Sequence, residues 1–436
     1  MMKKILFPSL LLLSFSFGNS QEPKKQDVNF TKRILENTEI RFLSSYYSQN
    51  GENAAVTGGL GTEALTDATG TIIVSIPLTA DDVLTINAGV SAYTSASSSN
   101  VSPFDGQQEA DPFVASTGAS SADTWVNMTG TYSHSSKDRN EIVAATVGVS
   151  KEYDYTSFSF GGSYRKLFNQ KNTELSISAT AYLDKWDAIY PIELRPFGID
   201  GIGFFRPTEI RGSSNYKPYF KELENTNRNS YIVGLGFSQI LHKQIQGALA
   251  LDLVQQEGLL STPFQRVYFA DIADTFIENF QLADAIERLP DTRFKVALGG
   301  RLHGYLNEVL MVRTYYRFYK DSWGISAHTA NVEIPIKITN TITLYPSYRW
   351  YKQTAADYFN LFETGLSTDT FYTSDYDLSK YTARQMGFGI SYTDILTKTQ
   401  LWKLGFKSID LKYYNYSRDT SFSFNIVTAG ITFLVQ

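Results

Sequence analysis

The sequence contains no cysteine and only four histidines. Without cysteine the chain can form no disulfide, carry no lipoprotein anchor and attach no c-type haem. Its net charge of −5 at pH 7 argues against nucleic acid as a partner. Beyond its first 20 residues the chain also lacks a linker, a low-complexity tract and a long apolar helix, so nothing in the composition divides it into separate domains.

The first 20 residues have the pattern of a secretory signal peptide. Lys3 and Lys4 precede the apolar run Ile5–Phe17, and we predict cleavage before Gln21. The run is shorter than the stretch of about 18 apolar residues that a spanning helix needs, which argues against a membrane anchor. We therefore expect an exported protein with a periplasmic N-terminal segment at 21–37 and one domain over 38–436.

What is abundant is strict alternation of apolar and polar residues. In Val83–Tyr93 the residues Leu84, Ile86, Ala88, Val90 and Ala92 lie on one face, and polar or small residues lie on the other. The same period recurs to the last residues of the chain, without helices that would cover a core. This pattern predicts an all-β fold, a transmembrane antiparallel β-barrel in the cell outer membrane. The expected strands are 38–49, 69–79, 83–95, 123–134, 141–152, 155–167, 173–186, 228–241, 245–256, 292–304, 308–320, 324–338, 341–352, 381–396, 401–416 and 422–436.

The connections between these 16 expected strands are of two kinds. Tight turns alternate with connections that include all the long loops, and these loops span 50–68, 96–122, 187–227, 257–291 and 353–380. Short periplasmic turns and long extracellular loops are typical of outer-membrane barrels, and an even count leaves both termini in the periplasm. Pro335 and Pro346 fall inside expected strands, where a missing N–H is costly, so we expect bulges there.

Five segments are distinctive: Glu39–Leu43 (EIRFL), Asn53–Gly59 (NAAVTGG), Ser261–Ala270 (STPFQRVYFA), His328–Asn331 (HTAN) and Tyr372–Lys380 (YTSDYDLSK). Together they resemble an uncharacterised outer-membrane β-barrel family of Bacteroidota that bears only a domain-of-unknown-function name, over nearly all of the mature chain. The resemblance implies a location and a fold but no activity. It also implies an association with a small lipoprotein, a thioredoxin-like protein and a flavin transferase, which hints at redox work in the envelope.

The polar faces of the later strands carry charge. Rings of charge inside a pore set its ion selectivity, whereas ion pairs between such residues would tie the lumen shut, and the sequence leaves both alternatives open. Arg313 and Arg317 would bias an open lumen toward anions unless Glu333 and Asp410 neutralise them. The pore-lining candidates are Arg293, Lys295, Arg301, Arg313, Tyr315, Arg317, Glu333, Arg349, Asp410 and Lys412.

Two loops have content that predicts folded structure. In 257–291 apolar residues such as Ile272, Phe276 and Ile286 recur at helical spacing, which predicts a short amphipathic helix that packs on the rim, closes the mouth or docks a partner. The loop 187–227 is rich in aromatic residues. Asp375 and Asp377 lack the spacing of a calcium loop, so a solvated loop is expected there and no metal site.

Signals for catalysis are weak. His134 and His242 fall at turns, His303 ends a strand, and His328 lacks an evident nucleophile and orienting partner. We expect no enzymatic activity and no cofactor. Two functions fit: a porin-like channel for small polar solutes or ions, and a scaffold barrel that anchors envelope partners such as a redox lipoprotein. The expected partners are outer-membrane lipid, the barrel-assembly machinery and a small envelope lipoprotein.

Overall fold

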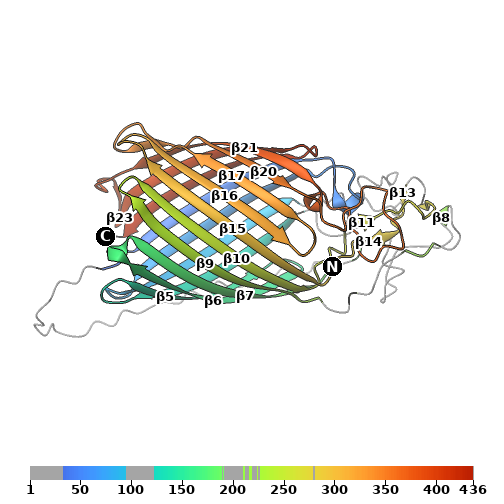
Figure 1. Cartoon of the computed structure of the whole chain (residues 1–436), viewed down its shortest axis with the longest axis horizontal. Coiled ribbons are helices and arrows are strands. Elements are labelled where there is room, and N and C mark those ends of the chain that lie inside the picture. Colours follow the sequence, from blue (N-terminus) through green and yellow to red (C-terminus); the bar gives the residue numbers. More distant parts are fainter. Residues whose placement is uncertain are drawn as a thin grey trace, which may run out of the picture. The chain divides into compact units, whose positions relative to one another are not determined.

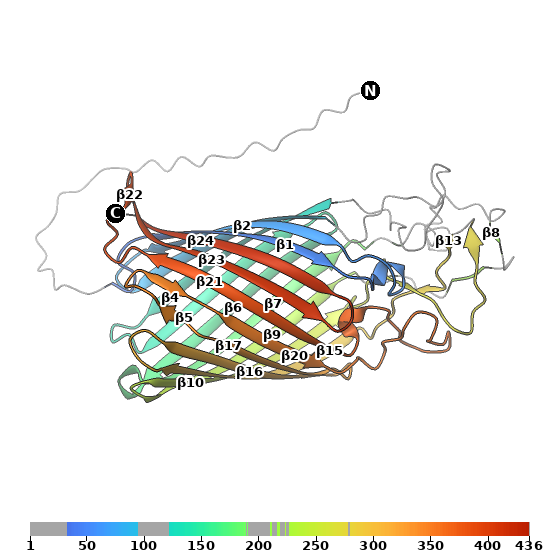
Figure 2. The same cartoon turned by 90° about the horizontal axis from the view of Figure 1, so that it is seen from above.

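The computed structural model describes residues 33–94, 122–188, 190, 210–211, 216–218, 223, 226–277 and 280–435. In this part of the chain one antiparallel sheet closes into a barrel of 16 strands (Figures 1 and 2). The sheet has 19 hydrogen-bonded segments, because two strands are interrupted and one turn carries the short segment β22. The predicted fold and number of strands are confirmed. No helix in these ranges is long and apolar enough to span a bilayer.

The strand bounds lie within a few residues of those expected from alternation. The largest shift is at the second strand, which begins four residues earlier than predicted. The wall consists of β1 (Glu39–Asn50), β2 (Leu65–Pro77), β3 (Asp82–Thr94), β4 (Ala122–Ser135), β5 (Glu141–Lys151), β6 (Tyr155–Phe168), β7 (Thr173–Trp186), β9 (Arg228–His242), β10 (Ile245–Gly258), β15 (Thr292–Tyr305), β16 (Met311–Asp321), β17 (Ser326–Glu333) with β18 (Ile336–Lys337), β19 (Ile342–Leu344) with β20 (Ser347–Gln353), β21 (Tyr381–Thr393), β23 (Leu404–Arg418) and β24 (Ser423–Val435).

The barrel closes between its first and last strands. β1 pairs with β2 on one side and with β24 on the other, in an unbroken register from Glu39 opposite Leu434 to Asn50 opposite Ser423. Closure satisfies the backbone groups of both terminal strands, which would otherwise form an open edge in lipid. The expected pairing of the first strand with the sixteenth is confirmed.

Alternation sorts the side chains into an outer and an inner face. Val90, Ala179 and Ile431 share the outer face with exposed Val126, Phe158 and Phe42, as the register of neighbouring strands shows. Asn87, Ser178 and Thr428 share the inner face. On the outer face near the short turns, Phe42, Phe406 and Phe433 form an aromatic cluster with centroid separations of 6.0–6.1 Å. These positions follow the alternation expected for Val83–Tyr93, with the apolar residues on the outer face.

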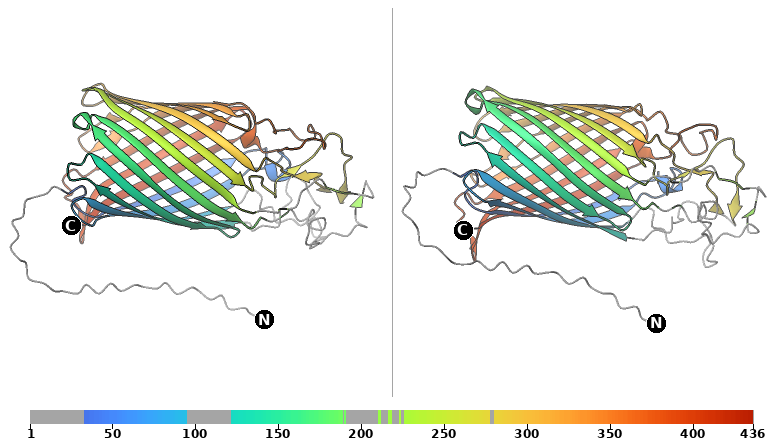
Figure 3. Two further views of the ribbon diagram at one scale, coloured as in Figure 1. Left: turned by 60° about the horizontal axis from the view of Figure 1, so that its bottom comes forward. Right: turned by 90° about the horizontal axis from the view of Figure 1, so that it is seen from below.

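The two ends of the barrel differ as predicted. Short turns, such as 78–81, 136–140 and 169–172, join strands at one end, and the long connections 51–64, 259–291 and 354–380 gather at the other. Figure 3 shows the turns at one end and the loops beyond the opposite strand ends, where Figure 1 labels the short elements β11 (Arg266–Val267) and β14 (Ala285–Ile286). The expected loops 96–122 and 187–227 lie largely outside the described residues.

The prolines interrupt two neighbouring strands without the predicted bulges. Glu333 pairs with Ser347 before the gap, and Ile336 pairs with Leu344 after it, so neither strand has an extra residue. Ile334 N–H donates to the Pro346 oxygen at 2.9 Å, and Met311 N–H donates to the Pro335 oxygen at 3.1 Å. Each proline therefore lacks one hydrogen-bond donor, but its carbonyl still accepts a hydrogen bond from the neighbouring strand, so the register continues. The prediction of bulges is wrong for this reason.

The predicted helix in 257–291 is also absent from the described residues of that loop. Its backbone forms the short segments β11, β12 (Phe276–Ile277), β13 (Phe280–Gln281) and β14 instead. β11 pairs with β14, and Arg288 exchanges backbone hydrogen bonds with Tyr372 of another loop. Apolar spacing suggested a helix, but the apolar side chains are buried against other loops, and such tertiary contacts override local periodicity.

Candidate functional site: the luminal wall and its cap

All ten predicted pore-lining residues lie on the inner face of the barrel. β15, β16, β17 and β20 bring eight of them into neighbouring positions, because Arg301 pairs with Tyr315, Tyr315 with Asn331, and Asn331 with Arg349. Lys412 and Asp410 lie on β23, opposite Gly389 and Ser391 of β21. The residues thus form one charged wall between β15 and β23, which we name the basic wall.

Part of the basic wall is neutralised by ion pairs. Arg293 Nη2 lies 2.5 Å from Asp321 Oδ2 and its guanidinium lies 4.2 Å from the ring centroid of Trp323. Arg313 Nη1 lies 2.8 Å from Glu333 Oε1. The anticipated neutralisation of Arg313 by Glu333 therefore occurs. These ion pairs connect neighbouring strands. The electric field in the lumen is therefore set by the cations that have no such partner.

Five cations of the basic wall have no carboxylate oxygen within 4.0 Å among the described residues. Three of them lie over tyrosine rings: Arg301 over Tyr315 at 5.4 Å, Arg317 over Tyr319 at 5.9 Å and Lys412 over Tyr345 at 5.6 Å. The Arg317 Nε is buried without a hydrogen-bond partner. Asp410 is an inward acid on the same wall and forms no ion pair there. The five cations are Lys295, Arg301, Arg317, Arg349 and Lys412.

The opposite wall, on β2 to β7, is dominated by hydroxyl and amide side chains. Thr131 and Thr146 oxygens lie 2.9 Å apart, and Ser75 and Thr85 oxygens lie 3.2 Å apart. Asp67, an inward acid on this wall, accepts a hydrogen bond from Ser91 at 2.7 Å. Asp123 and Asp184 lie on the inner face of this wall as well. The basic wall therefore faces a polar wall with inward acids, which creates a field across the lumen that acts on passing ions.

A pocket of about 290 Å³ opens on the basic wall toward the loop end. Arg349, Tyr351, Tyr381, Tyr416 and Phe424 line it together with Arg418. Arg418 donates to the Tyr416 hydroxyl at 3.0 Å and lies 2.6 Å from Asp377, so it is fixed, whereas exposed Arg349 has no partner among the described residues. A guanidinium beside aromatic faces suits a small anion that carries a ring or other apolar part.

Above this pocket, loops from opposite sides of the barrel meet. The loop 51–64 leaves β1, and the loop 259–291 leaves β10, which lies eight strands away around the wall of 16. Arg266, which is fully buried, donates from Nη1 to the Val56 carbonyl, and the Ser374 hydroxyl donates to the Arg266 carbonyl at 2.8 Å. Contact between these loops requires them to cross the mouth. We name the assembly of 51–64, 259–291 and 354–380 the cap.

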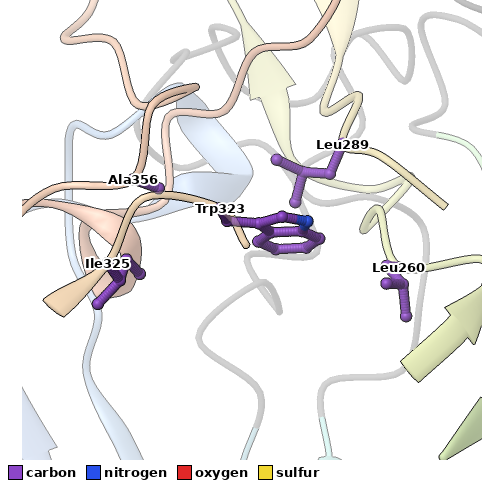
Figure 4. Packing of buried hydrophobic residues seen from close by; sticks show 5 residues of the cluster. All are labelled: Leu260, Leu289, Trp323, Ile325 and Ala356. Carbon is purple, nitrogen blue, oxygen red and sulfur yellow. The ribbon is translucent and has the colours of Figure 1, made fainter. Parts of the chain in front are cut away.

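The cap has a hydrophobic core of its own. Figure 4 shows Trp323 between Leu289 and Leu260, with Ile325 and Ala356 on its other side. A second cluster joins Val267, Phe269 and Ala285 to Tyr372. Because Trp323 and Ile325 belong to the turn between β16 and β17, the core anchors the cap to the rim of the basic wall. A loop region with a packed core holds a defined conformation rather than many.

Three carboxyl groups are buried inside the cap. Burial raises the pKa of Glu287 to about 8, and the nearby charge of Asp375 adds to this effect. Burial likewise raises the pKa of Asp284 to about 7 and, together with the charge of Asp377, that of Asp375 to about 6. Glu287 accepts hydrogen bonds from Thr262 N–H at 2.7 Å and from the Thr373 hydroxyl at 2.5 Å. The closed cap therefore favours the protonated acids.

The comparisons with known proteins bear on the family and the fold. The model of the family "Protein of unknown function (DUF3570)" matches residues 9–421, nearly the whole chain. The chain belongs to this family. No curated protein matches it. A bacterial polysaccharide outer membrane secretin is similar at 10% identity, with 92% of this chain and 99% of that chain covered and a TM-score of 0.43.

Two further solved barrels are similar over nearly their full length. OccK2 (OpdF) of Pseudomonas aeruginosa in complex with glucuronate has 8% identity, with 94% of this chain and 100% of that chain covered and a TM-score of 0.41. A deltaS2 mutant of TodX, a monoaromatic hydrocarbon channel, has 9% identity, coverage of 92% and 91%, and a TM-score of 0.39. At such identities and TM-scores these likenesses carry no argument about this chain. The closed antiparallel sheet of 16 strands itself makes this DUF3570 protein an outer-membrane-type β-barrel.

The structure gives His328 and the acidic residues of 372–380 partners within the barrel wall and the cap. His328 lies on the outer face, where its Nδ1 is 2.7 Å from the Tyr316 hydroxyl. Asp375 accepts a hydrogen bond from Asp377 N–H and caps the turn η5 (Tyr376–Leu378), while Asp377 pairs with Arg418. No group of three or more metal-ligating side chains occurs in the part of the chain that the structure describes.

Sequence reasoning missed Arg418 and Asp321 on the basic wall. Both lie on the inner face by the same two-residue period as their neighbours, Asp321 after Tyr319 and Arg418 after Tyr416. The expected strands ended at 320 and 416, which excluded them. Extending the alternation to the last inward residue of each strand identifies both.

Proposed function

We propose that this DUF3570 protein is an outer-membrane channel for small polar solutes with a preference for anions. The observation that carries the proposal is the basic wall, whose five unpaired cations face a hydroxyl-rich wall across the lumen. The guanidinium groups of Arg301, Arg317 and Arg349 stay charged at any working pH, so their part of this field does not depend on pH. A barrel of 16 strands is also wide enough for an aqueous channel.

The pocket at Arg349 supports a transient contact with the solute. Conduction needs binding that is weak enough to allow release, and a half-open pocket with one free guanidinium fits this need. The aromatic faces of Tyr351, Tyr381 and Tyr416 would hold the less polar part of the solute.

A second candidate is a scaffold barrel that anchors envelope partners. The cap favours it, because a folded surface with its own core crosses the mouth. Under this alternative the cap would stay closed and the lumen would conduct no ions. The two functions therefore differ in one measurable property.

Planar-bilayer recording under a potassium chloride gradient tests the proposal. We expect the wild-type protein to conduct and its reversal potential to indicate anion preference, and we expect Arg317→Gln with Arg349→Gln to shift that potential toward cations. Lys171→Gln is a matched control, because Lys171 lies in a tight turn away from the lumen. Absence of conductance in the wild type and in a variant lacking 354–380 would overturn the channel and favour the scaffold.

A further inference from the structure

The lipid-facing side of the barrel carries a cluster of cations near the loop end. Lys320, Lys352 and Arg384 are exposed on the outer faces of β16, β20 and β21, and His328 on β17 lies between them. The register sets His328 directly opposite Lys352, and Trp350, two residues before Lys352, opposite Arg384. Opposed and diagonal positions on adjacent strands lie within about 8 Å, so the four side chains form one patch.

The cations of the patch form no ion pair, because no carboxylate lies within 4.0 Å of them among the described residues. Their outward neighbours are Phe318, Ser326, Trp350 and Thr382. One acid lies on the same rim: Asp419, just beyond the end of β23, accepts a hydrogen bond from Thr382 N–H at 2.9 Å. At the end of β7, by contrast, Lys185 lies 3.5 Å from Asp187. Unpaired charge on a lipid-facing wall is unfavourable except near the interface.

The position of the patch points to lipid headgroups. Its residues lie within four positions of the loop-end limits of their strands, and loop ends face outward in outer-membrane barrels. Long basic side chains at this level extend toward the headgroups. The outer leaflet there is built from a glycolipid with phosphate groups, and lysine and arginine bind phosphate through charge-assisted hydrogen bonds.

An apolar groove on the same outer wall begins at Tyr316, in the middle of β16, and continues toward the short turns, where Leu241, Leu302 and Thr314 lie within three residues of their strand limits. It has a volume of about 620 Å³, and Gly300 and Ala330 are among its small outward residues. Tyr316 links the two features, since it lines the groove and its hydroxyl lies 2.7 Å from His328 Nδ1. The Tyr316 end of the groove is therefore the part that an acyl chain extending from a headgroup at the patch can reach.

We propose that Lys320, Lys352 and Arg384, assisted by His328, bind the phosphate groups of one outer-leaflet glycolipid whose acyl chain contacts the Tyr316 end of this groove. The cations supply charge, and the groove supplies the apolar contact that a free phosphate cannot use. This site lies on the outside of the barrel and does not depend on conduction through the lumen.

The test compares lipid binding by the wild-type protein and a triple variant, Lys320→Gln with Lys352→Gln and Arg384→Gln, in nanodiscs. The probes are diphosphorylated lipid A, dephosphorylated lipid A and inorganic phosphate, and the readouts are native mass spectrometry and the unfolding temperature. We expect diphosphorylated lipid A to bind the wild type at least tenfold more tightly than the triple variant and to stabilise the wild type alone. Lys185→Gln is the matched control and should bind as the wild type does.

Each other outcome overturns the proposal. Equal binding of dephosphorylated lipid A would leave only the groove, and equal stabilisation by inorganic phosphate would leave only a general anion site. Unchanged affinity in the triple variant would exclude the cations. Should the triple variant fail to fold, the single variant Lys352→Gln is compared with the wild type instead. We expect its affinity for diphosphorylated lipid A to fall severalfold. Wild-type affinity in that variant would count against the site.

Discussion

The buried Glu287 predicts that the cap opens more readily as the pH rises. Its pKa is raised from 4.5 to about 8 in the closed cap. Below pH 4.5 the carboxyl is protonated whether the cap is closed or open. Between pH 4.5 and 8 the open loop releases the proton while the closed cap keeps it, so the closed state loses stability as the pH rises. Above pH 8 no further loss occurs.

The size of the effect follows from this pKa. Each pH unit in the window changes the opening free energy by about 1.36 kcal/mol for one group, so a change from pH 5 to pH 8 gives about 4 kcal/mol, or roughly a thousandfold in the opening equilibrium. Asp284 and Asp375 act in the same direction over the lower part of the window, since their pKa values are raised to about 7 and about 6. Glu287→Gln should remove the contribution of Glu287 and flatten the dependence between pH 7 and 8, where the other two acids no longer contribute.

Hydrogen exchange measures this opening at defined amides. Arg288 N–H donates to the Tyr372 oxygen at 3.0 Å, and Tyr372 N–H donates to the Arg288 oxygen at 2.7 Å, so both amides are protected only while the two loops stay together. Exchange rates corrected for intrinsic pH dependence should show this protection fall from pH 5 to 8 in the wild type. The exposed Glu52 provides a control, Glu52→Gln, with wild-type behaviour. Protection that is constant or rises with pH would refute the reasoning.

Three further predictions concern the wall and the cap. Deleting 428–436 removes the partner of β1 and should abolish assembly, so the chain should show no heat-modifiable band on SDS gels; a folded band would contradict closure through β24. Val90→Arg and Ile431→Arg should each cost about 2–4 kcal/mol near the membrane midplane, and Asn87→Arg and Thr428→Arg much less, in urea unfolding from liposomes; equal costs would refute the assignment of faces. Gly58→Ala should loosen the cap, because Gly58 has φ +82° and an added Cβ would lie 2.5 Å from the Tyr268 ring. We expect faster protease cleavage within 259–291 and unchanged stability of the barrel.

The alternation of side chains with a period of two residues was enough to predict most of the fold. Side-chain direction in a strand depends only on parity, so Val90 and Asn87 could be assigned to opposite faces without knowledge of their neighbours. Turn length then fixed which strands are adjacent and which end holds the loops. For the same reason the ten residues of the basic wall were found on one face before any register was known.

Tertiary structure decided what alternation cannot express. Which cations are neutralised depends on strand register, which places Glu333 beside Arg313 and leaves Arg317 and Arg349 without a carboxylate. Neighbouring carbonyls, and not a bulge, hold the register at Pro335 and Pro346. The cap is the clearest case, because Arg266 and Val56 are 210 residues apart in the chain and meet only after the barrel has closed. The sequence determines to which face of a strand each side chain points. The contacts between loops across the mouth depend on the closed barrel, which sets where the two ends of each loop lie.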